Sequence, residues 1–188
     1  MRPGLLLVDL QRDYLSAESL RPPSAEIVES TAALVAGCRR LDVPVLHAWT
    51  TIRSDGDRMP HWKRQGKWAC VEGTPGHSPP RALEPLEGEE IFHKRFFDPF
   101  GDSRLESTLR GLGADTLIVA GVYLHACVRA AALGAYERGL EAWIVEDAVG
   151  SDEPLHAAET RRWLSGRVAT FLPAARILEL VEGADVPK

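Results

Sequence analysis

The sequence predicts an α/β fold: a three-layer α-β-α arrangement in which a six-stranded, mostly parallel sheet carries helices on both faces. Short apolar runs alternate along the chain with segments of helical periodicity, and this alternation is typical of βαβ units, which build parallel sheets. The runs are short and apolar, as expected of strands that helices cover on both faces. Since 188 residues are typical of one domain, we expect a single domain over residues 1–188.

Each expected element follows from its local pattern. The strands are the apolar runs at residues 4–8, 43–49, 90–94, 116–121, 142–145 and 167–171. The stretches between them that are expected to be helices lie at residues 24–41, 102–112, 127–138 and 154–164. In the first helix, apolar residues recur on one face, and Ser24 is placed as the N-cap. In the second, Asp102 is the expected N-cap and Gly113 ends the helix.

Residues 50–88 follow neither periodicity. Loops of this length are uncommon in a compact domain and are usually functional, so we expect a lid or an interface segment here. The segment contains Trp62 and Trp68, while Tyr14 and Phe96 lie shortly after two of the predicted strands. These four rings could line a pocket for a flat or apolar substrate. They could equally be buried against a second subunit, because aromatic residues are enriched at interfaces.

Composition and charge point to a small-molecule partner. The formal net charge of −5 provides no basic field for nucleic acid. The first apolar run, residues 5–8, is followed at once by Asp9, so it is too short for a signal peptide or a membrane span, and we expect a cytoplasmic protein. The 3 cysteines cannot all pair, and no CxxC spacing occurs. This pattern argues against a disulfide framework and a zinc-finger site.

Three chemically reactive residues follow predicted strands. Asp9, Lys94 and Cys127 lie at or just beyond the ends of the runs at residues 4–8, 90–94 and 116–121. In an open α/β sheet, ligands bind beyond the carboxyl ends of the strands, so the three side chains can converge. Taken singly, the aspartate could cap a turn, the lysine could be a surface residue, and the cysteine could be a small buried residue. Taken together, a carboxylate, an amine and a thiol are the groups needed to attack a carbonyl carbon.

The surroundings of Cys127 are those of an activated thiol. A thiol of pKa ~8.5 becomes more reactive beside a helix N-terminus, a cation or a base, and here the helix start, Lys94 and Asp9 offer all three. Backbone N–H groups between Tyr123 and Cys127 are placed to bind an oxyanion. We therefore expect iodoacetamide at mildly acidic pH to label Cys127 ahead of Cys38, on an apolar helix face, and of Cys70, in a loop without an activating cation.

Four segments carry a recognisable pattern. Residues 8–14 read VDLQRDY, residues 70–76 CVEGTPG, residues 94–100 KRFFDPF and residues 121–128 GVYLHACV. The first, third and fourth look like the D-x-Q-x-D-F, K-x-x-x-S-A-F and G-x-x-T-x-x-C-V boxes of the isochorismatase-like cysteine hydrolases, and the second resembles a further segment. This superfamily includes nicotinamidases and N-carbamoylsarcosine amidohydrolases. The resemblance spans the whole chain, and its segments are in the right order.

The sequence departs from that pattern at a few positions. Asp98 and Pro99 replace Ser-Ala, Leu124 stands where the family usually has threonine, and Ala131 and Gly134 stand where threonine and aspartate often follow the cysteine. These changes alter the pocket wall rather than the three reactive residues. The resemblance therefore does not identify one substrate.

The resemblance implies a Rossmann-like fold and a catalytic triad of Asp9, Lys94 and Cys127. In the family the cysteine attacks the carbonyl carbon, the aspartate carries the proton, and the lysine holds thiolate and aspartate in register. It also implies a non-proline cis peptide bond, Val122–Tyr123, that turns the Tyr123 N–H to join the Cys127 N–H in an oxyanion hole. The predicted substrate pocket consists of Gln11, Tyr14, Trp62, Trp68 and Phe96.

These observations predict a cysteine hydrolase that cleaves a C–N bond of a small amide, ureido or carbamoyl compound through an acyl-thioester intermediate. Two alternatives remain open. One is vinyl-ether hydrolysis of the isochorismatase type, which in the family uses the aspartate as acid and does without the cysteine. The other is a non-catalytic binding protein on the same fold. We expect no cofactor and a homo-oligomer, either a dimer or a tetramer.

A metal site is not predicted. Asp55, Asp57 and His61 lie where nicotinamidases carry the ligands of a divalent metal, but Asp57 stands in the place of the expected histidine. The three residues are kept only as candidate ligands. His125, two residues before Cys127, invites comparison with Cys–His enzymes. In a tight turn, however, its ring is not expected to reach the sulfur.

Overall fold

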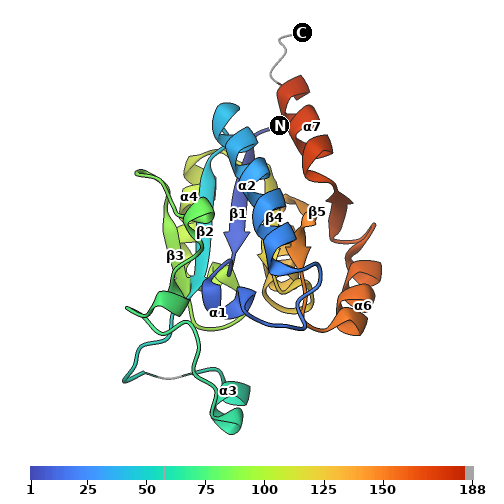
Figure 1. The fold of residues 1–188 in the computed structure, drawn as a ribbon. Helices are drawn as coiled ribbons and strands as arrows, with labels where there is room; N and C mark the ends of the chain where they lie inside the picture. Colours follow the sequence, from blue (N-terminus) through green and yellow to red (C-terminus); the bar gives the residue numbers. More distant parts are fainter. Residues whose placement is uncertain (57, 185–188) are drawn as a thin grey trace.

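The computed structural model describes residues 1–56 and 58–184 and contains a six-stranded sheet (Figure 1). In sheet order the strands are β3 (Ile91–Lys94), β2 (Val45–Thr50), β1 (Pro3–Val8), β4 (Thr116–Val122), β5 (Glu141–Gly150) and β6 (Ala169–Leu172). Each strand is parallel to its neighbours in the sheet. The predicted fold class is confirmed, and the sheet is parallel throughout rather than mostly parallel.

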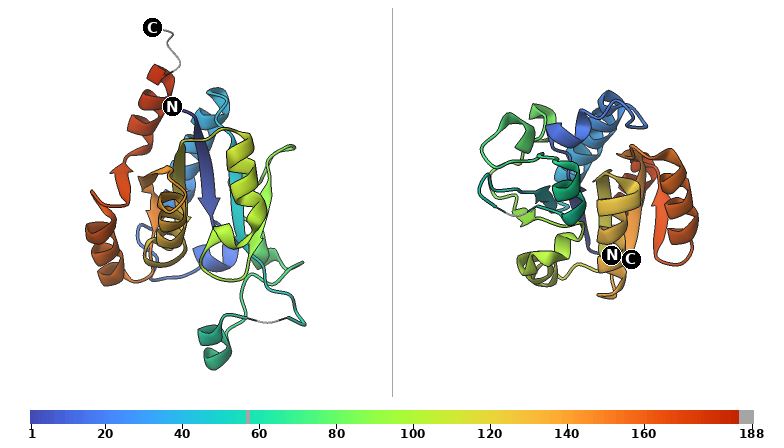
Figure 2. Two further views of the ribbon diagram at one scale, coloured as in Figure 1. Left: turned by 180° about the vertical axis from the view of Figure 1, so that it is seen from behind. Right: turned by 90° about the horizontal axis from the view of Figure 1, so that it is seen from below.

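Helices cover both faces of the sheet, as predicted. On one face lie α1 (Arg12–Leu15), α2 (Ser24–Arg40) and α7 (Ala174–Ala184), and on the other lie α4 (Ser103–Gly111), α5 (Arg129–Tyr136) and α6 (Pro154–Leu164). Figure 1 shows α2 in front of the sheet, and the view from behind in Figure 2 shows α4 and α5 on the opposite face.

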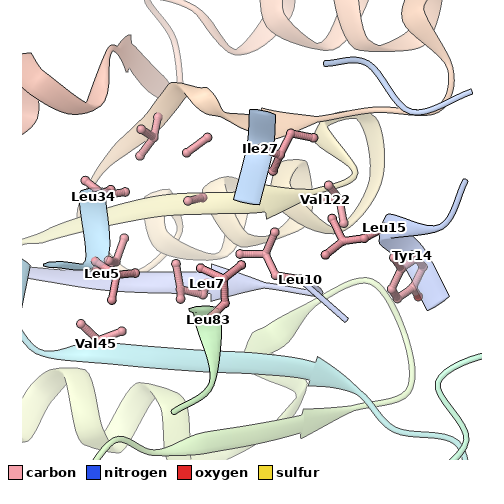
Figure 3. Packing of buried hydrophobic residues seen from close by; sticks show 14 of the residues in the cluster. Leu5, Leu7, Leu10, Tyr14, Leu15, Ile27, Leu34, Val45, Leu83 and Val122 are labelled. Carbon is pink, nitrogen blue, oxygen red and sulfur yellow. The ribbon is translucent and has the colours of Figure 1, made fainter. Parts of the chain in front are cut away.

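Alternate residues of β1 separate the two cores, because successive side chains of a strand point to opposite faces. Leu5 and Leu7 pack with Ile27 and Leu34 of α2 in the first core (Figure 3). Leu6 and Val8 belong to the second core, together with the apolar residues of α4 and α5. The central strand is thus buried on both sides, which explains its unbroken apolar sequence.

Strand β5 is longer than predicted. It continues to Gly150, beyond the expected end at Val145, although Glu146 and Asp147 are polar. These two side chains are not fully buried, whereas the three residues that follow are. A register shift between β4 and β5 accompanies this extension, opposite residues 119–121. The predicted end of this strand at Val145 is therefore wrong, and the other predicted strand ends differ by no more than two residues.

The helix predictions are correct in part. Asp102 caps α4, where its carboxylate accepts a hydrogen bond from the Arg104 N–H at 3.1 Å. Ser24 is not a cap, because α2 begins at Ser24 and Pro23 precedes it. The stretch predicted as one helix from Cys127 divides into a π-helical turn, Leu124–Val128, and α5. Helix α7 was not predicted.

The segment at residues 50–88 has structure of its own. It contains α3 (Pro60–Gln65) and two 3-10 turns, Pro75–His77 and Arg81–Leu83. A bridge between Ile52 and Val71 closes its first part. Helix α3 lies beyond the end of the sheet toward which β1 points (Figure 1). The segment thus extends outward from the edge that carries the strand ends. Across the described ranges, no helix combines the length and apolar character needed to cross a membrane.

Candidate active site

Asp9, Lys94 and Cys127 meet at the carboxyl ends of the strands. The Lys94 ammonium donates hydrogen bonds to Asp9 Oδ2 at 2.7 Å and to Cys127 Sγ at 3.3 Å. The three residues are almost fully buried, with 0, 5 and 4% of their surfaces exposed respectively. They therefore form one ion-paired and hydrogen-bonded group.

The sheet brings these residues together. Asp9 follows β1 directly, Lys94 ends β3, and Cys127 lies in the π-helical turn after β4. The chain leaves β1 with a left-handed backbone at Asp9, φ 53°, a conformation that aspartate tolerates better than most residues. Gly121 has a φ of +130°, and a Cβ there would lie 2.0 Å from the Val8 carbonyl oxygen. Glycine at this position lets β4 approach the end of β1 closely.

Thr50, at the end of β2, links the group and was missed in the sequence. Its hydroxyl donates to Asp9 Oδ1 at 2.9 Å and accepts from Lys94 Nζ at 2.9 Å and Tyr14 OH at 3.2 Å. One donor and two acceptor positions are the full capacity of a hydroxyl group. The Thr50 N–H also donates to Asp9 Oδ1, at 2.8 Å. Asp9 is thus held from the β2 side as well as by Lys94.

Gln11 does not line the pocket, so its predicted place is wrong. Its side chain instead holds the backbone of Thr50 by hydrogen bonds. Its side-chain amide donates to the carbonyl oxygens of Thr50 at 2.9 Å and His77 at 2.7 Å. Its own oxygen accepts from the Thr50 N–H at 2.9 Å. The side chain is fully buried. Gln11 therefore ties β2 to the 3-10 turn at Pro75–His77.

The resting group holds a carboxylate, an ammonium and a neutral thiol. Burial would lower the pKa of Lys94, but the charge of Asp9 and the hydrogen bonds to Asp9 and Cys127 outweigh it and raise that pKa. Burial raises the pKa of the Cys127 thiol well above its usual value, and Asp9 raises it further, against the effect of Lys94. A thiolate here would be a second buried anion beside one cation. The expectation of an acidic thiol is therefore wrong.

The turn after β4 contains the predicted cis bond. The Val122–Tyr123 peptide bond is cis. The Tyr123 carbonyl accepts hydrogen bonds from the N–H groups of Ala126 and Val128, at 3.0 and 3.2 Å. The Tyr123 hydroxyl donates to the Tyr14 carbonyl at 3.0 Å. The oxyanion-binding role of the Tyr123 and Cys127 N–H groups remains a prediction.

A pocket of about 740 Å³ opens beside Cys127. Its wall includes the aromatic side chains of Tyr14, Trp62, Phe97 and Tyr123. Two of these, Tyr14 and Trp62, are among the predicted pocket residues. The pocket therefore joins the sheet edge to the segment at residues 50–88.

Trp68 and Phe96 do not line this pocket, contrary to prediction. Both are about half exposed. The Arg58 guanidinium lies 3.9 Å from the centre of the Trp68 ring. Phe96 contributes its backbone carbonyl, which accepts from Lys94 Nζ at 3.1 Å, and the next residue, Phe97, reaches the pocket instead.

The family follows from comparison with known proteins. Residues 3–173 match the model of the isochorismatase domain family. The chain belongs to the isochorismatase family. It is a hydrolase of that family, and its six-stranded sheet is the fold of that family.

Relatives of this isochorismatase-family hydrolase include amidohydrolases. Maleamate amidohydrolase from Pseudomonas putida is 30% identical over 159 residues, which cover 79% of this chain and 72% of that protein. Nicotinamidase 3 from Arabidopsis thaliana is 26% identical over 165 residues, covering 82% of this chain and 77% of that protein. The crystal structure of an isochorismatase family protein from Desulfovibrio vulgaris superposes with a TM-score of 0.84 at 27% identity, covering 96% of this chain and 98% of that one.

The candidate metal ligands of this family member do not come together within the part of the chain that the structure describes. Asp55 is exposed and accepts two hydrogen bonds from Arg53, at 3.1 and 3.2 Å. His61 lines the pocket, and its ring centre lies 5.8 Å from that of Phe97. Asp57 lies outside the described residues. Within residues 1–56 and 58–184, no three histidine, cysteine, aspartate or glutamate side chains form a metal-binding group.

His125 is directed to a different partner from Cys127. Its Nδ1 shares a hydrogen bond with the Ser151 hydroxyl, and its ring stacks on Tyr123 with centres 6.0 Å apart. A Cys–His pair as in other cysteine enzymes is therefore not formed through this nitrogen.

The three cysteines differ in their access to the pocket. Cys38 and Cys70 are fully buried, and burial raises the pKa of Cys38 to about 12 and that of Cys70 above its usual range. Cys127 lines the pocket. Access, rather than a low pKa, distinguishes Cys127 from the other two.

Proposed function

We propose that this protein cleaves a C–N bond of a small amide, ureido or carbamoyl compound, with Cys127 as nucleophile. One observation carries the proposal: the Lys94 ammonium donates hydrogen bonds to the Asp9 carboxylate and to the Cys127 thiol, and that thiol lines a pocket. Two relatives support the reaction class, since they are named maleamate amidohydrolase and nicotinamidase. The oxyanion donors are the N–H groups of Tyr123 and Cys127.

Asp9 Oδ2 is the proton acceptor in the first step. Oδ1 already accepts from both the N–H and the hydroxyl of Thr50, whereas Oδ2 accepts from Lys94. The thiol gives its proton to Oδ2 as Sγ attacks the carbonyl carbon, and the carbonyl π electrons move to oxygen. A neutral Asp9, the Lys94 cation and one oxyanion then balance in charge. The buried group stays neutral overall, which avoids an uncompensated charge.

The second half regenerates the thiol. The tetrahedral intermediate collapses, the C–N bond breaks, and the leaving nitrogen takes the proton from Asp9. The product bound to the enzyme is an acyl thioester on Cys127. A water molecule then attacks this carbonyl and gives a proton to Asp9. Collapse of the second intermediate breaks the C–S bond, returns the proton to sulfur and releases a carboxylic acid.

Ammonia release across a panel of primary amides and ureides tests the proposal. We expect the wild-type protein to hydrolyse at least one compound and Cys127→Ala to lose the activity. Cys38→Ala is the matched control, because that thiol lies in the core under α2, away from the pocket. Hydrolysis of a vinyl ether that survives Cys127→Ala would instead identify isochorismatase-type chemistry with Asp9 as acid. Ligand binding without any turnover would identify a non-catalytic binding protein.

We also propose that residues 1–188 act as one domain in the cytoplasm and assemble as a dimer or tetramer. The three unpaired cysteines suit a reducing compartment. The half-exposed rings of Trp68, Phe96 and Trp163 suit burial against another subunit. Light scattering on the purified protein measures the assembly directly, and a monomer at micromolar concentration would contradict it.

A further inference from the structure

Asp152 lies on the pocket wall at a neighbouring strand end. It follows β5 by two residues, and Gly150 at the end of β5 pairs with Val122 at the end of β4. Ser151 is held by two backbone hydrogen bonds to Arg21, at 2.8 and 2.9 Å. Asp152 is therefore anchored beside the turn that carries Cys127, and both residues line the same pocket.

The Asp152 carboxylate has an unfilled acceptor. Its Oδ1 is buried and has no hydrogen-bond partner among the described residues. His125 Nε2 lies 4.0 Å away, beyond hydrogen-bond distance. Burial lowers the pKa of His125, so this ring is neutral at neutral pH and does not balance the charge. The side chain as a whole is 28% exposed and lines the pocket, so a cationic group of a ligand can pair with this partly buried carboxylate.

The neighbouring acidic residue differs in exposure. Glu153 also lines the pocket and pairs with His156 Nδ1 at 2.6 Å, but 55% of its side chain is exposed against 28% for Asp152. The charge of Glu153 is therefore screened more by water than that of Asp152.

Aromatic rings surround the same space. Tyr14 meets Tyr123 edge to face with ring centres 5.4 Å apart, and it lies 6.2 Å from Trp62. The Tyr123 hydroxyl donates to the Tyr14 carbonyl, so Tyr123 contributes its ring rather than its hydroxyl to the pocket wall. Ring faces attract cations, and they do so more strongly in a partly desolvated site.

Two cations also line the pocket, and both are exposed. Lys67 lies over Trp62, with Nζ 5.0 Å from the ring centre, and the Arg129 guanidinium lies 5.5 Å from the centre of Trp163. No ion pair joins either of them to Asp152 within the described chain. Because exposed charges are screened by water and salt, their effect on a ligand is weaker than that of a buried acceptor.

We propose that the pocket takes amides whose far end carries a positively charged, N–H-bearing group, and that Asp152 selects this group. The inference rests on the proposed function only in assuming that the amide lies beside Cys127. The ammonium or amidinium of the substrate pairs with the accessible side of the Asp152 carboxylate while its carbon chain lies against the Tyr14, Trp62 and Tyr123 rings.

Binding to the Cys127→Ala protein tests this selection without requiring turnover. Calorimetry compares γ-aminobutyramide, valeramide and glutaramate, which share one spacer and end in an ammonium, a methyl and a carboxylate group. Longer homologues of each cover the reach of the pocket. We expect the ammonium series to bind most tightly. Adding Asp152→Asn should weaken its binding on the order of tenfold or more and leave valeramide unchanged. Glu141→Gln, an exposed carboxylate at the opposite end of β5, is the matched control and should change neither.

Several results would overturn the proposal. These are tighter binding of the carboxylate series, equal loss for all three ligands in Asp152→Asn, or no binding by any ammonium homologue. Unchanged valeramide binding shows that the variant is folded. If the wild-type protein hydrolyses none of these amides although the ammonium series binds through Asp152, the proposed function fails and the selection stands.

Discussion

The two walls of the pocket are built in different ways. The first wall, at the strand ends, is Cys127 with Asp9 and Lys94 behind it, and all three are buried and linked by hydrogen bonds through Lys94. The opposite wall comes from residues 59–67, where Trp62 is buried but Lys67 is exposed. The first wall holds charges in a dry, rigid environment and the second presents ring faces. The reactive group thus lies at the sheet edge, and the segment that faces it contributes apolar and aromatic surface to the pocket.

The segment at residues 50–88, which carries the second wall, is joined to the chain after β1 and β2 by hydrogen bonds. The Cys70 N–H donates to the Asp13 carboxylate at 2.6 Å, and Ile52 N–H donates to the Cys70 carbonyl at 3.0 Å. A Cβ at Gly76 would lie 2.0 Å from Asp13 Oδ1, so glycine is required where the segment passes this carboxylate. The segment can therefore differ in sequence elsewhere while these anchors are kept.

The largest expected effect is on stability at the first wall. Lys94→Met removes the cation and leaves the buried Asp9 carboxylate unpaired, so the free energy of unfolding should fall by about 3–5 kcal/mol. Urea unfolding at neutral pH measures the change. Lys67→Met, at the second wall, is the matched control and should cost less than about 1 kcal/mol, since its ammonium is exposed over Trp62. Equal losses in the two variants would remove the distinction between the walls.

A smaller effect is expected from neighbouring threonines. Thr50→Val deletes a hydroxyl that bonds Asp9, Lys94 and Tyr14, so it should cost about 1–3 kcal/mol and slow hydrolysis. Thr51→Val deletes a hydroxyl bonded to His77 and His93, outside the reactive group. It should leave the rate of hydrolysis near the wild-type value. A similar loss of rate in both variants would show that Thr50 acts only through the local fold.

The first wall could be predicted from the sequence because each of its residues directly follows or ends a recognisable strand, or lies in the turn after it. Apolar runs identify strands, and ionisable residues directly after them must lie at one edge of a parallel sheet. Asp9, Lys94 and Cys127 follow this rule. Thr50 follows it too, but an uncharged residue at a strand end provides no comparable signal. Asp152 could not be predicted in this way, because the predicted strand stops at Val145 whereas β5 continues to Gly150, two residues before Asp152.

The second wall could not be predicted in the same way. Residues 50–88 have no periodicity, and only tertiary contacts decide that Trp62 is buried while Trp68 is half exposed. The protonation state of Cys127 also escaped sequence reasoning. A nearby lysine lowers a thiol pKa, but complete burial and an adjacent carboxylate oppose it, and the balance depends on the folded structure.

Alkylation measures that balance. Since Asp9 raises the pKa of Cys127, iodoacetamide should label the wild-type thiol slowly at neutral pH and faster as the pH rises. Asp9→Asn removes the negative charge and leaves Lys94, so the pKa of Cys127 should fall and labelling at pH ~7 should accelerate on the order of tenfold. Cys38 and Cys70 serve as internal controls and should stay unlabelled in the folded protein. Slower labelling of Asp9→Asn would show that the carboxylate does not hold the thiol protonated.

The most direct test of Cys127 as nucleophile is to trap the acyl enzyme. Acid quenching within the first turnover of a hydrolysed amide, followed by peptide mass spectrometry, should show the acyl mass on the Cys127 peptide and on neither of the other cysteine peptides. Hydroxylamine should remove that mass, because a thioester is cleaved by it. An unmodified Cys127 peptide throughout turnover, together with full activity of Cys127→Ala, would contradict the proposed mechanism.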